Sequence, residues 1–158
     1  MGKAKTLKAI PTTYKGIQFR SKLEAKYARA FDKLGIVWIY EGGGFLFDDG
    51  TAYCPDFYMP DMDTYFEVKG VLDDKSIHKI RSLVDDGERI FVGDPNGRIH
   101  SGNSIGGRSH DGRIAKCSYC GNVFFLDELS SWECTCCGKW DGDHHLEYIE
   151  ENIFDMVW

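Results

Sequence analysis

The spacing of apolar residues predicts a helix near the N-terminus. Between residues 21 and 34, apolar side chains recur at the three- and four-residue intervals of one helix face. The members of this face are Leu23, Tyr27, Ala30, Phe31 and Leu34. Ser21 suits the N-cap, with Glu24 three residues later, and Gly35 suits the end. The pattern therefore predicts an amphipathic helix over 21–34.

Extended segments and a second helix follow. Residues 36–41 combine β-branched and aromatic side chains, and three glycines come directly after them. In chain order, the pattern predicts strands at 36–41 and 45–47, a hairpin of strands 51–59 and 65–69, a helix at 73–86 and a strand at 89–93. Apart from the short strand at 45–47, the order is a helix, three strands, a helix and a strand, which is typical of an α/β core with a mixed sheet.

The chain changes character on both sides of this core. Residues 1–13 form a predicted basic N-terminal arm, and the core extends over 14–94. From residue 95 to residue 112, glycines recur with serine and asparagine between them, which predicts a linker or loop. Residues 113–158 contain five of the six cysteines and end in an acidic, aromatic-rich tail. They form a fourth predicted unit.

Charge is distributed unevenly along the chain. The 158 residues carry a formal net charge of −6, yet residues 1–33 hold nine Lys and Arg against two acidic residues, a net +7. A basic N-terminal segment on an otherwise acidic chain can still bind a phosphate backbone. A solvated lysine face explains the same charges, and charge alone favours that explanation.

Composition excludes several classes of protein. The 42% hydrophobic content is enough for a packed core, and no apolar run approaches the length of a membrane span. No apolar stretch follows the N-terminal lysines, as a secretory signal would require. We therefore expect a cytoplasmic protein without a membrane partner.

The stretches 54–57 and 66–70 carry the most informative polar pattern. Alternate side chains of a strand share a face, so Glu67 and Lys69 are expected to project together. Ten residues separate Asp56 from Glu67, enough for a hairpin that brings the two carboxylates together. Glu24, at the margin of the apolar stripe of the first helix, can reach the same place.

Carboxylates beside a lysine suit the hydrolysis of a phosphodiester. Hard oxygen ligands hold Mg²⁺ or Mn²⁺, and the metal lowers the pKa of a bound water. Lys69 could orient that water or counter charge on the phosphate. The plain alternative is an ordinary turn aspartate, an exposed cross-strand Glu–Lys pair and a capping-box glutamate.

As an ordered set, these motifs resemble the PD-(D/E)XK nuclease superfamily. The segments GIQFRSKLEAKYARAF, WIYE, YCPDFYMPD and YFEVKG, within residues 14–93, are similar to those of small phage-encoded members. The resemblance implies a restriction-endonuclease-like fold and a divalent-metal-dependent deoxyribonuclease. If the protein is phage-encoded, it would act in the cytoplasm of the bacterial host cell.

The resemblance also implies roles for individual residues in catalysis. Asp56, Glu67 and the carbonyl of Val68 would bind the catalytic Mg²⁺ or Mn²⁺, and Lys69 would be catalytic. Glu24 matches a helix carboxylate that many members add to the metal site. No residue of the core motif is missing.

Substrate contacts are implied at the start of the first helix. Arg20 and Ser21 match positions where such proteins carry a basic and a small polar residue near the phosphate, and Lys22 adjoins them. Glu41 follows the first strand without an evident role. The implied partner is duplex or branched DNA, and a homodimer would supply the two sites that cutting both strands requires.

The C-terminal cysteines form two CxxCG motifs, with 13 residues between Cys120 and Cys134. This spacing predicts a zinc ribbon with one structural Zn²⁺. The four expected ligands are Cys117, Cys120, Cys134 and Cys137. Cys136 could replace one ligand of the second motif, and His144 or His145 could compete as ligands.

Two other functions fit parts of this pattern. A non-catalytic protein could use a nuclease-like core and the zinc ribbon to bind DNA or another protein, but the intact acidic and lysine set argues against it. Paired CxxC motifs near histidines also occur in HNH nucleases. Too little chain follows His145 to complete that motif.

Overall fold

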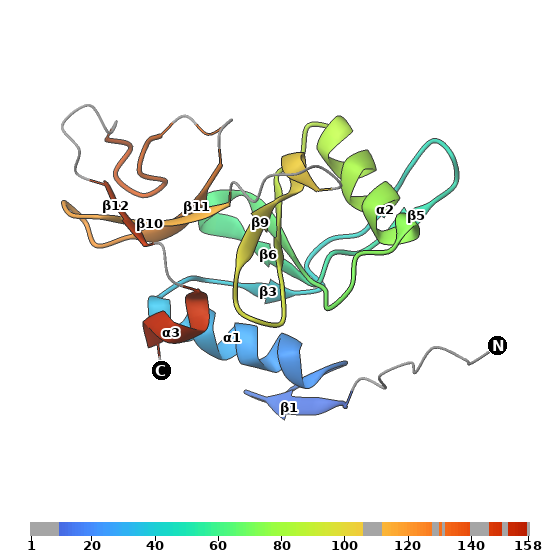
Figure 1. The fold of residues 1–158 in the computed structure, drawn as a ribbon, viewed down its shortest axis with the longest axis horizontal. Helices are drawn as coiled ribbons and strands as arrows, with labels where there is room; N and C mark the ends of the chain where they lie inside the picture. Colours follow the sequence, from blue (N-terminus) through green and yellow to red (C-terminus); the bar gives the residue numbers. More distant parts are fainter. Residues whose placement is uncertain are drawn as a thin grey trace.

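The computed structural model describes residues 10–105, 112–127, 130, 132–139, 146–149 and 152–157. A five-stranded sheet lies at the centre, with helices α1 (Lys22–Leu34) and α2 (Asp74–Asp85) beside it (Figure 1). A three-stranded sheet lies at the end of the molecule away from α2. The fold is α/β, as predicted.

The helices begin and end at signals visible in the sequence. Ser21 caps α1, because its hydroxyl accepts a hydrogen bond from the N–H of Glu24, and Gly35 ends it at a φ of 74°. Asp73 caps α2 through its carboxylate. A short third helix, α3 (Ile153–Val157), packs against α1. None of the described helices has the length and apolar character needed to cross a membrane.

The central sheet has the strand order β3-β6-β7-β8-β9. Its members are β3 (Ile39–Tyr40), β6 (Phe57–Met59), β7 (Thr64–Val68), β8 (Ile90–Gly93) and β9 (Ile99–Ser101). β7 and β8 are parallel and are joined through α2, whereas the other neighbouring pairs are antiparallel. A 3-10 turn, Pro60–Met62, connects β6 to β7. The predicted mixed sheet is therefore present.

The strand predicted at 51–59 is divided in two. β5 (Ala52–Tyr53) pairs with β4 (Phe45–Leu46) in a separate sheet, while β6 pairs with β7. Pro55 lies at the break, where a residue without an N–H cannot donate to a ladder. The strand predicted at 36–41 is reduced to the two residues of β3.

The predicted basic arm, 1–13, ends earlier than expected. Its last two residues belong to β1 (Thr12–Tyr14), which pairs with β2 (Ile17–Phe19) in a hairpin ahead of α1. The alternating pattern of this hairpin is too short to stand out in the sequence. Residues 1–9 of the arm lie outside the described part of the chain.

The predicted linker, 95–112, is also shorter than expected. It contains β9 and a 3-10 turn, Gly102–Ser104, which belong to the core. The glycines indicated a loop, but Ile99 and Ser101 are buried where β9 pairs with β8. Residues 106–111 lie outside the described part.

Separate apolar cores cover the two faces of the central sheet. On β8, Phe91 packs in the same core as Phe31 of α1, whereas the adjacent Ile90 and Val92 pack with Leu83 of α2. This alternation is the two-residue period of a strand buried on both faces. It explains why β8 is a short, continuous apolar run.

The cysteine-containing segment shares the α1-side core. It folds into a three-stranded sheet of β10 (Arg113–Cys117), β11 (Val123–Leu126) and β12 (Leu146–Ile149). The ring of Phe125 lies 5.6 Å from that of Phe66 and 5.5 Å from that of Phe91, between ring centroids. Arg89 donates a hydrogen bond to the Phe125 carbonyl at 2.9 Å. The segment is therefore packed onto the central sheet.

Gly93 gives a test of this packing. A Cβ atom at this position would lie 2.5 Å from Tyr27 Cζ and 2.6 Å from Phe66 Cζ. We expect Gly93→Ala to lower the free energy of unfolding by about 1–3 kcal/mol, because overpacking a filled core forces its side chains to shift. Urea denaturation measures the change. Gly44→Ala is the matched control, since its Cβ would meet nothing within 4 Å, and equal stability of the two variants would contradict the close packing.

Candidate functional site

Three buried carboxylates come from α1, the segment before β6, and β7. Glu24, Asp56 and Glu67 are only 4%, 4% and 8% exposed. A buried charge is costly unless it is paired or hydrogen-bonded. The partners of these carboxylates therefore decide what this part of the molecule can do.

Asp56 and Glu67 lie opposite each other in the β6–β7 hairpin. The register pairs Phe57 with Phe66, which places the preceding Asp56 beside Glu67. The N–H of Asp56 donates to Oε2 of Glu67 at 3.2 Å, and the N–H of Val68 donates to Oδ2 of Asp56 at 2.8 Å. The backbone itself therefore positions both side chains.

Two tyrosine hydroxyls donate hydrogen bonds to Glu67 and Glu24. The Tyr53 hydroxyl donates to Oε2 of Glu67 at 2.9 Å, and the Tyr40 hydroxyl donates to Oε2 of Glu24 at 2.9 Å. Sequence reasoning missed both, because aromatic residues in extended segments usually pack in a core. The position of Tyr53, three residues before Asp56, is a weak sign that it belongs to the site. Nothing in the sequence around Tyr40 indicates its contact with Glu24.

One guanidinium group contacts three carboxylates. Nη2 of Arg20 lies 2.5 Å from Oδ1 of Asp56, 3.5 Å from Oε1 of Glu41 and 3.6 Å from Oε2 of Glu24. Its Nε donates to the Tyr40 hydroxyl at 3.2 Å. Arg20 reaches these groups from the turn between β2 and α1, four residues before Glu24.

Burial raises the pKa of both central carboxyl groups. Burial and the charges of Glu67 and Glu24 raise the pKa of Asp56 to about 8. Burial also raises the pKa of Glu67, although the Tyr53 hydroxyl and the positive charge of Lys69 oppose that change. The site thus holds more negative charge than its neighbours compensate, which favours the uptake of a proton or a cation.

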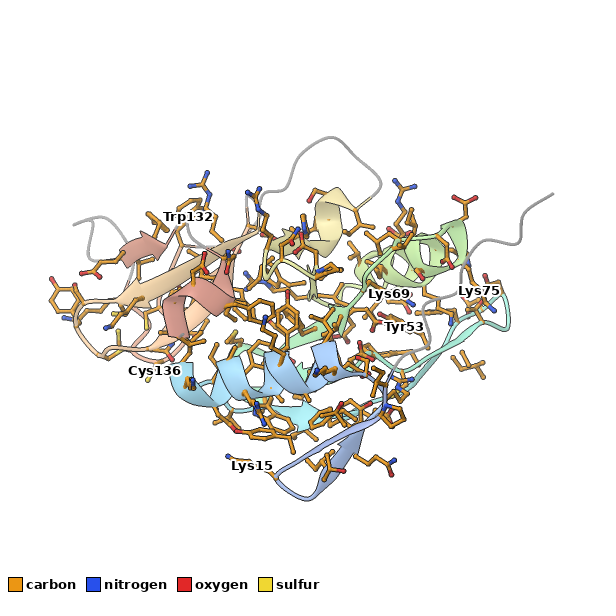
Figure 2. All side chains as sticks on the ribbon, turned by 60° about the horizontal axis from the view of Figure 1, so that its bottom comes forward. Lys15, Tyr53, Lys69, Lys75, Trp132 and Cys136 are labelled. Atoms are coloured by element: carbon orange, nitrogen blue, oxygen red, sulfur yellow. The ribbon has the colours of Figure 1, made fainter. Side chains whose placement is uncertain are left out.

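The other predicted residues occupy different positions. Lys69 directly follows β7, and Figure 2 shows it at the same end of the sheet as Tyr53. Within the described part of the chain, Lys69 has no ion-pair partner inside 4.0 Å. The Ser21 hydroxyl is engaged as the N-cap of α1, and Lys22 is exposed without contacting a carboxylate.

The three carboxylates do not form one compact ligand set. Among the described residues, only the group of four cysteines brings three or more such ligand atoms within 4.8 Å of one another. Glu67 alternates along β7 with Phe66 and Val68, which face the α1-side core. Glu67 therefore lies on the α2 side of the sheet, whereas Glu24 belongs to α1 and is linked to Asp56 through Arg20.

The cysteine cluster has the geometry of a tetrahedral metal site. Sγ of Cys117 lies 3.7 Å from that of Cys137, and Sγ of Cys120 lies 3.4 Å from that of Cys134. Four sulfurs around an ion with bonds of about 2.3 Å would be separated by about 3.8 Å. These four cysteines could therefore hold a metal ion such as zinc.

Two tight turns present the cysteines. Gly121 donates its N–H to the carbonyl of Cys117 at 2.7 Å, and Gly138 donates to that of Cys134 at 2.9 Å. Both glycines have φ above 70°, which explains the glycine after each CxxC. Cys136 is exposed and lies outside the cluster. The predicted competing ligands, residues 144–145, lie outside the described part.

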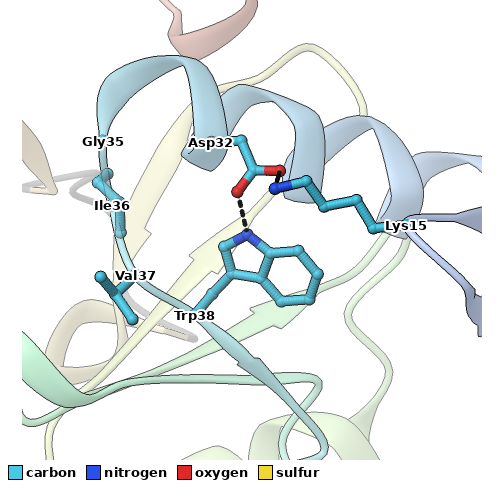
Figure 3. Close-up of a pocket in the computed structure, with 6 residues that line it drawn as sticks. All are labelled: Lys15, Asp32, Gly35, Ile36, Val37 and Trp38. Atoms are coloured by element: carbon cyan, nitrogen blue, oxygen red, sulfur yellow. Dashed lines mark hydrogen bonds and ion pairs between the residues drawn. The ribbon is translucent and has the colours of Figure 1, made fainter.

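A hollow at the end of α1 contains a third polar cluster. Figure 3 shows Asp32 between Trp38 and Lys15. Its carboxylate accepts from Nε1 of Trp38 at 2.9 Å, pairs with Nζ of Lys15 at 2.9 Å, and also accepts from Tyr14. These partners tie the β1–β2 hairpin to α1, so the cluster has a structural role.

We expect the magnesium-free protein to lose stability as the pH rises from the ordinary Asp56 value of 3.8 to about 8. In this interval the folded state keeps the Asp56 proton while the unfolded chain releases it, so the free energy of unfolding falls with rising pH. One such group contributes at most about 1.4 kcal/mol per pH unit. Asp56→Asn should flatten the dependence, measured by urea denaturation without magnesium or manganese. A slope left unchanged would assign it to another group.

Comparison with known proteins does not assign a function to this site. No model of a protein family matches the sequence, and no curated protein matches it.

Proposed function

We propose that the chain is a Mg²⁺- or Mn²⁺-dependent endonuclease that hydrolyses DNA phosphodiester bonds, built on a core of the PD-(D/E)XK kind. The observation that carries this proposal is the pair of buried carboxylates Asp56 and Glu67 in the β6–β7 hairpin, with the buried Glu24 linked to Asp56 through Arg20. Ordinary surface carboxylates are exposed and need no such arrangement.

The residues fit a hard divalent cation. The donor set is carboxylate oxygen, the type that Mg²⁺ and Mn²⁺ prefer. Burial raises the pKa of Asp56 and Glu67, so a cation beside these groups would stabilise their ionised forms. We assign Asp56, Glu67 and the Val68 carbonyl as its ligands, with Glu24 as a further carboxylate from α1. When bound, the ion would activate a water and counter charge on the phosphate.

The chain's own cations have separate roles in this proposal. Lys69, at the end of β7, orients the attacking water or offsets charge that develops on the phosphate. Arg20 lies at the exposed side of the carboxylates, where it can bind a substrate phosphate. The Ser21 hydroxyl is engaged as a helix cap, so Ser21 can offer the phosphate little more than its backbone.

The cysteine cluster is proposed to hold one structural Zn²⁺. A four-cysteine site leaves no open position for a substrate, so it suits a structural rather than a catalytic role. Phe125, in the strand between the two motifs, packs against Phe66 of β7. A metal in this cluster would therefore stabilise the strand that carries Glu67.

Asp56→Asn, Glu67→Gln and Lys69→Ala should each lower plasmid nicking in Mg²⁺ or Mn²⁺ by at least about 100-fold, the effect typical of losing a catalytic proton-transfer group or ligand. Glu24→Gln should have a smaller effect, since α1 supplies an additional carboxylate. Gel analysis of supercoiled plasmid measures nicking, and circular dichroism confirms the fold.

The matched control is Asp61→Asn, an exposed carboxylate in the turn between β6 and β7. It should retain wild-type nicking. Linear, forked and four-way DNA substrates then define the preferred structure. Full activity in a folded Asp56 or Glu67 variant would refute the assignment, and DNA binding without cleavage of any substrate would favour a non-catalytic binding protein.

Elemental analysis should find one zinc ion per purified chain. Cys134→Ser should lose the ion and lower the melting temperature, because it removes a buried member of the cluster. Cys136→Ser should keep the ion, since Cys136 lies outside the cluster. The reverse pattern would show that Cys136 is the ligand.

A further inference from the structure

The guanidinium group of Arg20 contacts carboxylate oxygens that a cation bound to Asp56 and Glu24 would use. Its Nη2 atom contacts Asp56, Glu24 and Glu41 together. Oδ2 of Asp56 already accepts the N–H of Val68, so Arg20 takes Oδ1, the oxygen without a backbone partner. A cation ligated by Asp56 and Glu24 would compete with Arg20 for the same atoms.

Arg20 has room to leave this position. Its side chain is 61% exposed, whereas those of Asp56 and Glu24 are almost fully buried. A hollow beside it is lined by residues that include Gln18 and Tyr40. The buried carboxylates are therefore held firmly, and the arginine is the partner that can move.

Charge balance favours exchange over simultaneous binding. When the buried carboxylates are ionised, one guanidinium compensates only part of their negative charge, and a divalent ion brings twice its charge to the same oxygens. Two cations within a few ångströms repel each other strongly where water is partly excluded. A divalent ion would therefore drive Arg20 outward, toward the side from which a substrate approaches.

We propose that Arg20 is an internal counter-ion, which occupies the cation position until a divalent ion displaces it and then turns outward to bind a substrate phosphate. This inference rests on the proposed function, because it concerns the same cation site. The apparent affinity for the ion is lowered by the fraction of molecules in which Arg20 holds the carboxylates. Arg20 thus couples metal binding to phosphate binding.

The first test measures Mn²⁺ binding to the full-length, zinc-loaded protein, from the paramagnetic resonance signal of free Mn²⁺. Arg20→Ala should tighten binding about three- to tenfold, as expected if Arg20 holds the carboxylates in most molecules. Tyr40→Phe removes the hydroxyl that accepts from Arg20 Nε without changing charge, and should tighten binding by a smaller factor. Lys22→Ala removes an equal charge from a residue that contacts no carboxylate, and should leave Mn²⁺ affinity unchanged.

The second test measures phosphate binding, through the anisotropy of a labelled DNA duplex across a salt series. With Ca²⁺ present, Arg20→Ala should flatten the slope of log affinity against log salt by about 0.9, the contribution of one phosphate contact. Without divalent ions, Arg20 is held by the carboxylates and the same substitution should leave the slope unchanged. Equal flattening in both conditions would overturn the exchange.

The two proposals fail in different ways. If Asp56→Asn abolishes Mn²⁺ binding but Arg20→Ala binds no more tightly than Lys22→Ala, the counter-ion role is wrong and the cation site stands. If the wild-type protein and Asp56→Asn bind Mn²⁺ equally, the carboxylates hold no cation. That result would remove the proposed function together with the role of Arg20.

Discussion

The pairing of β6 with β7 is the constraint on which the rest of the site depends. It places two carboxylates, Asp56 and Glu67, opposite each other with almost no access to water. Like charges in such a place must be compensated or protonated. Backbone N–H groups and the Tyr53 hydroxyl compensate part of the charge, and the raised pKa of Asp56 reflects the remainder. The remaining negative charge favours the uptake of a proton or a cation.

The surrounding core keeps this costly arrangement in place. β7 and β8 are parallel, and Phe66 and Phe91 on these strands pack against Phe125 of the cysteine-containing sheet. Gly93 leaves the space that the rings of Tyr27 and Phe66 occupy. Because the cysteine-containing segment belongs to this aromatic layer, its cysteine cluster and the carboxylate site are supported by one core. The predicted core, 14–94, and the cysteine-containing unit, 113–158, therefore pack together.

The site combines buried anions with more exposed cations. Hydrogen bonds from the backbone and from tyrosines hold the carboxylates, whereas Arg20 is largely exposed and Lys69 has no ion-pair partner in the described part of the chain. In the proposed function, preorganised carboxylates with accessible counter-charges would bind a metal ion and a phosphate in succession. A purely structural ion-pair network would pair each cation at a closed position.

Local patterns by themselves determined much of this protein. Capping by Ser21, termination at Gly35, the alternation in β7 and the CxxCG motifs each depend on residues close in the chain, and the structure agrees with each of them. The break at Pro55, the strand β9 and the shared core depend on which segments pair, and only the tertiary structure decided them. The same holds for the contacts of Arg20. The sequence shows that an arginine precedes a helix. It does not show that Asp56, 36 residues further along the chain, contacts this arginine. That contact depends on how the strands come together, because side-chain charges act through space and not along the chain.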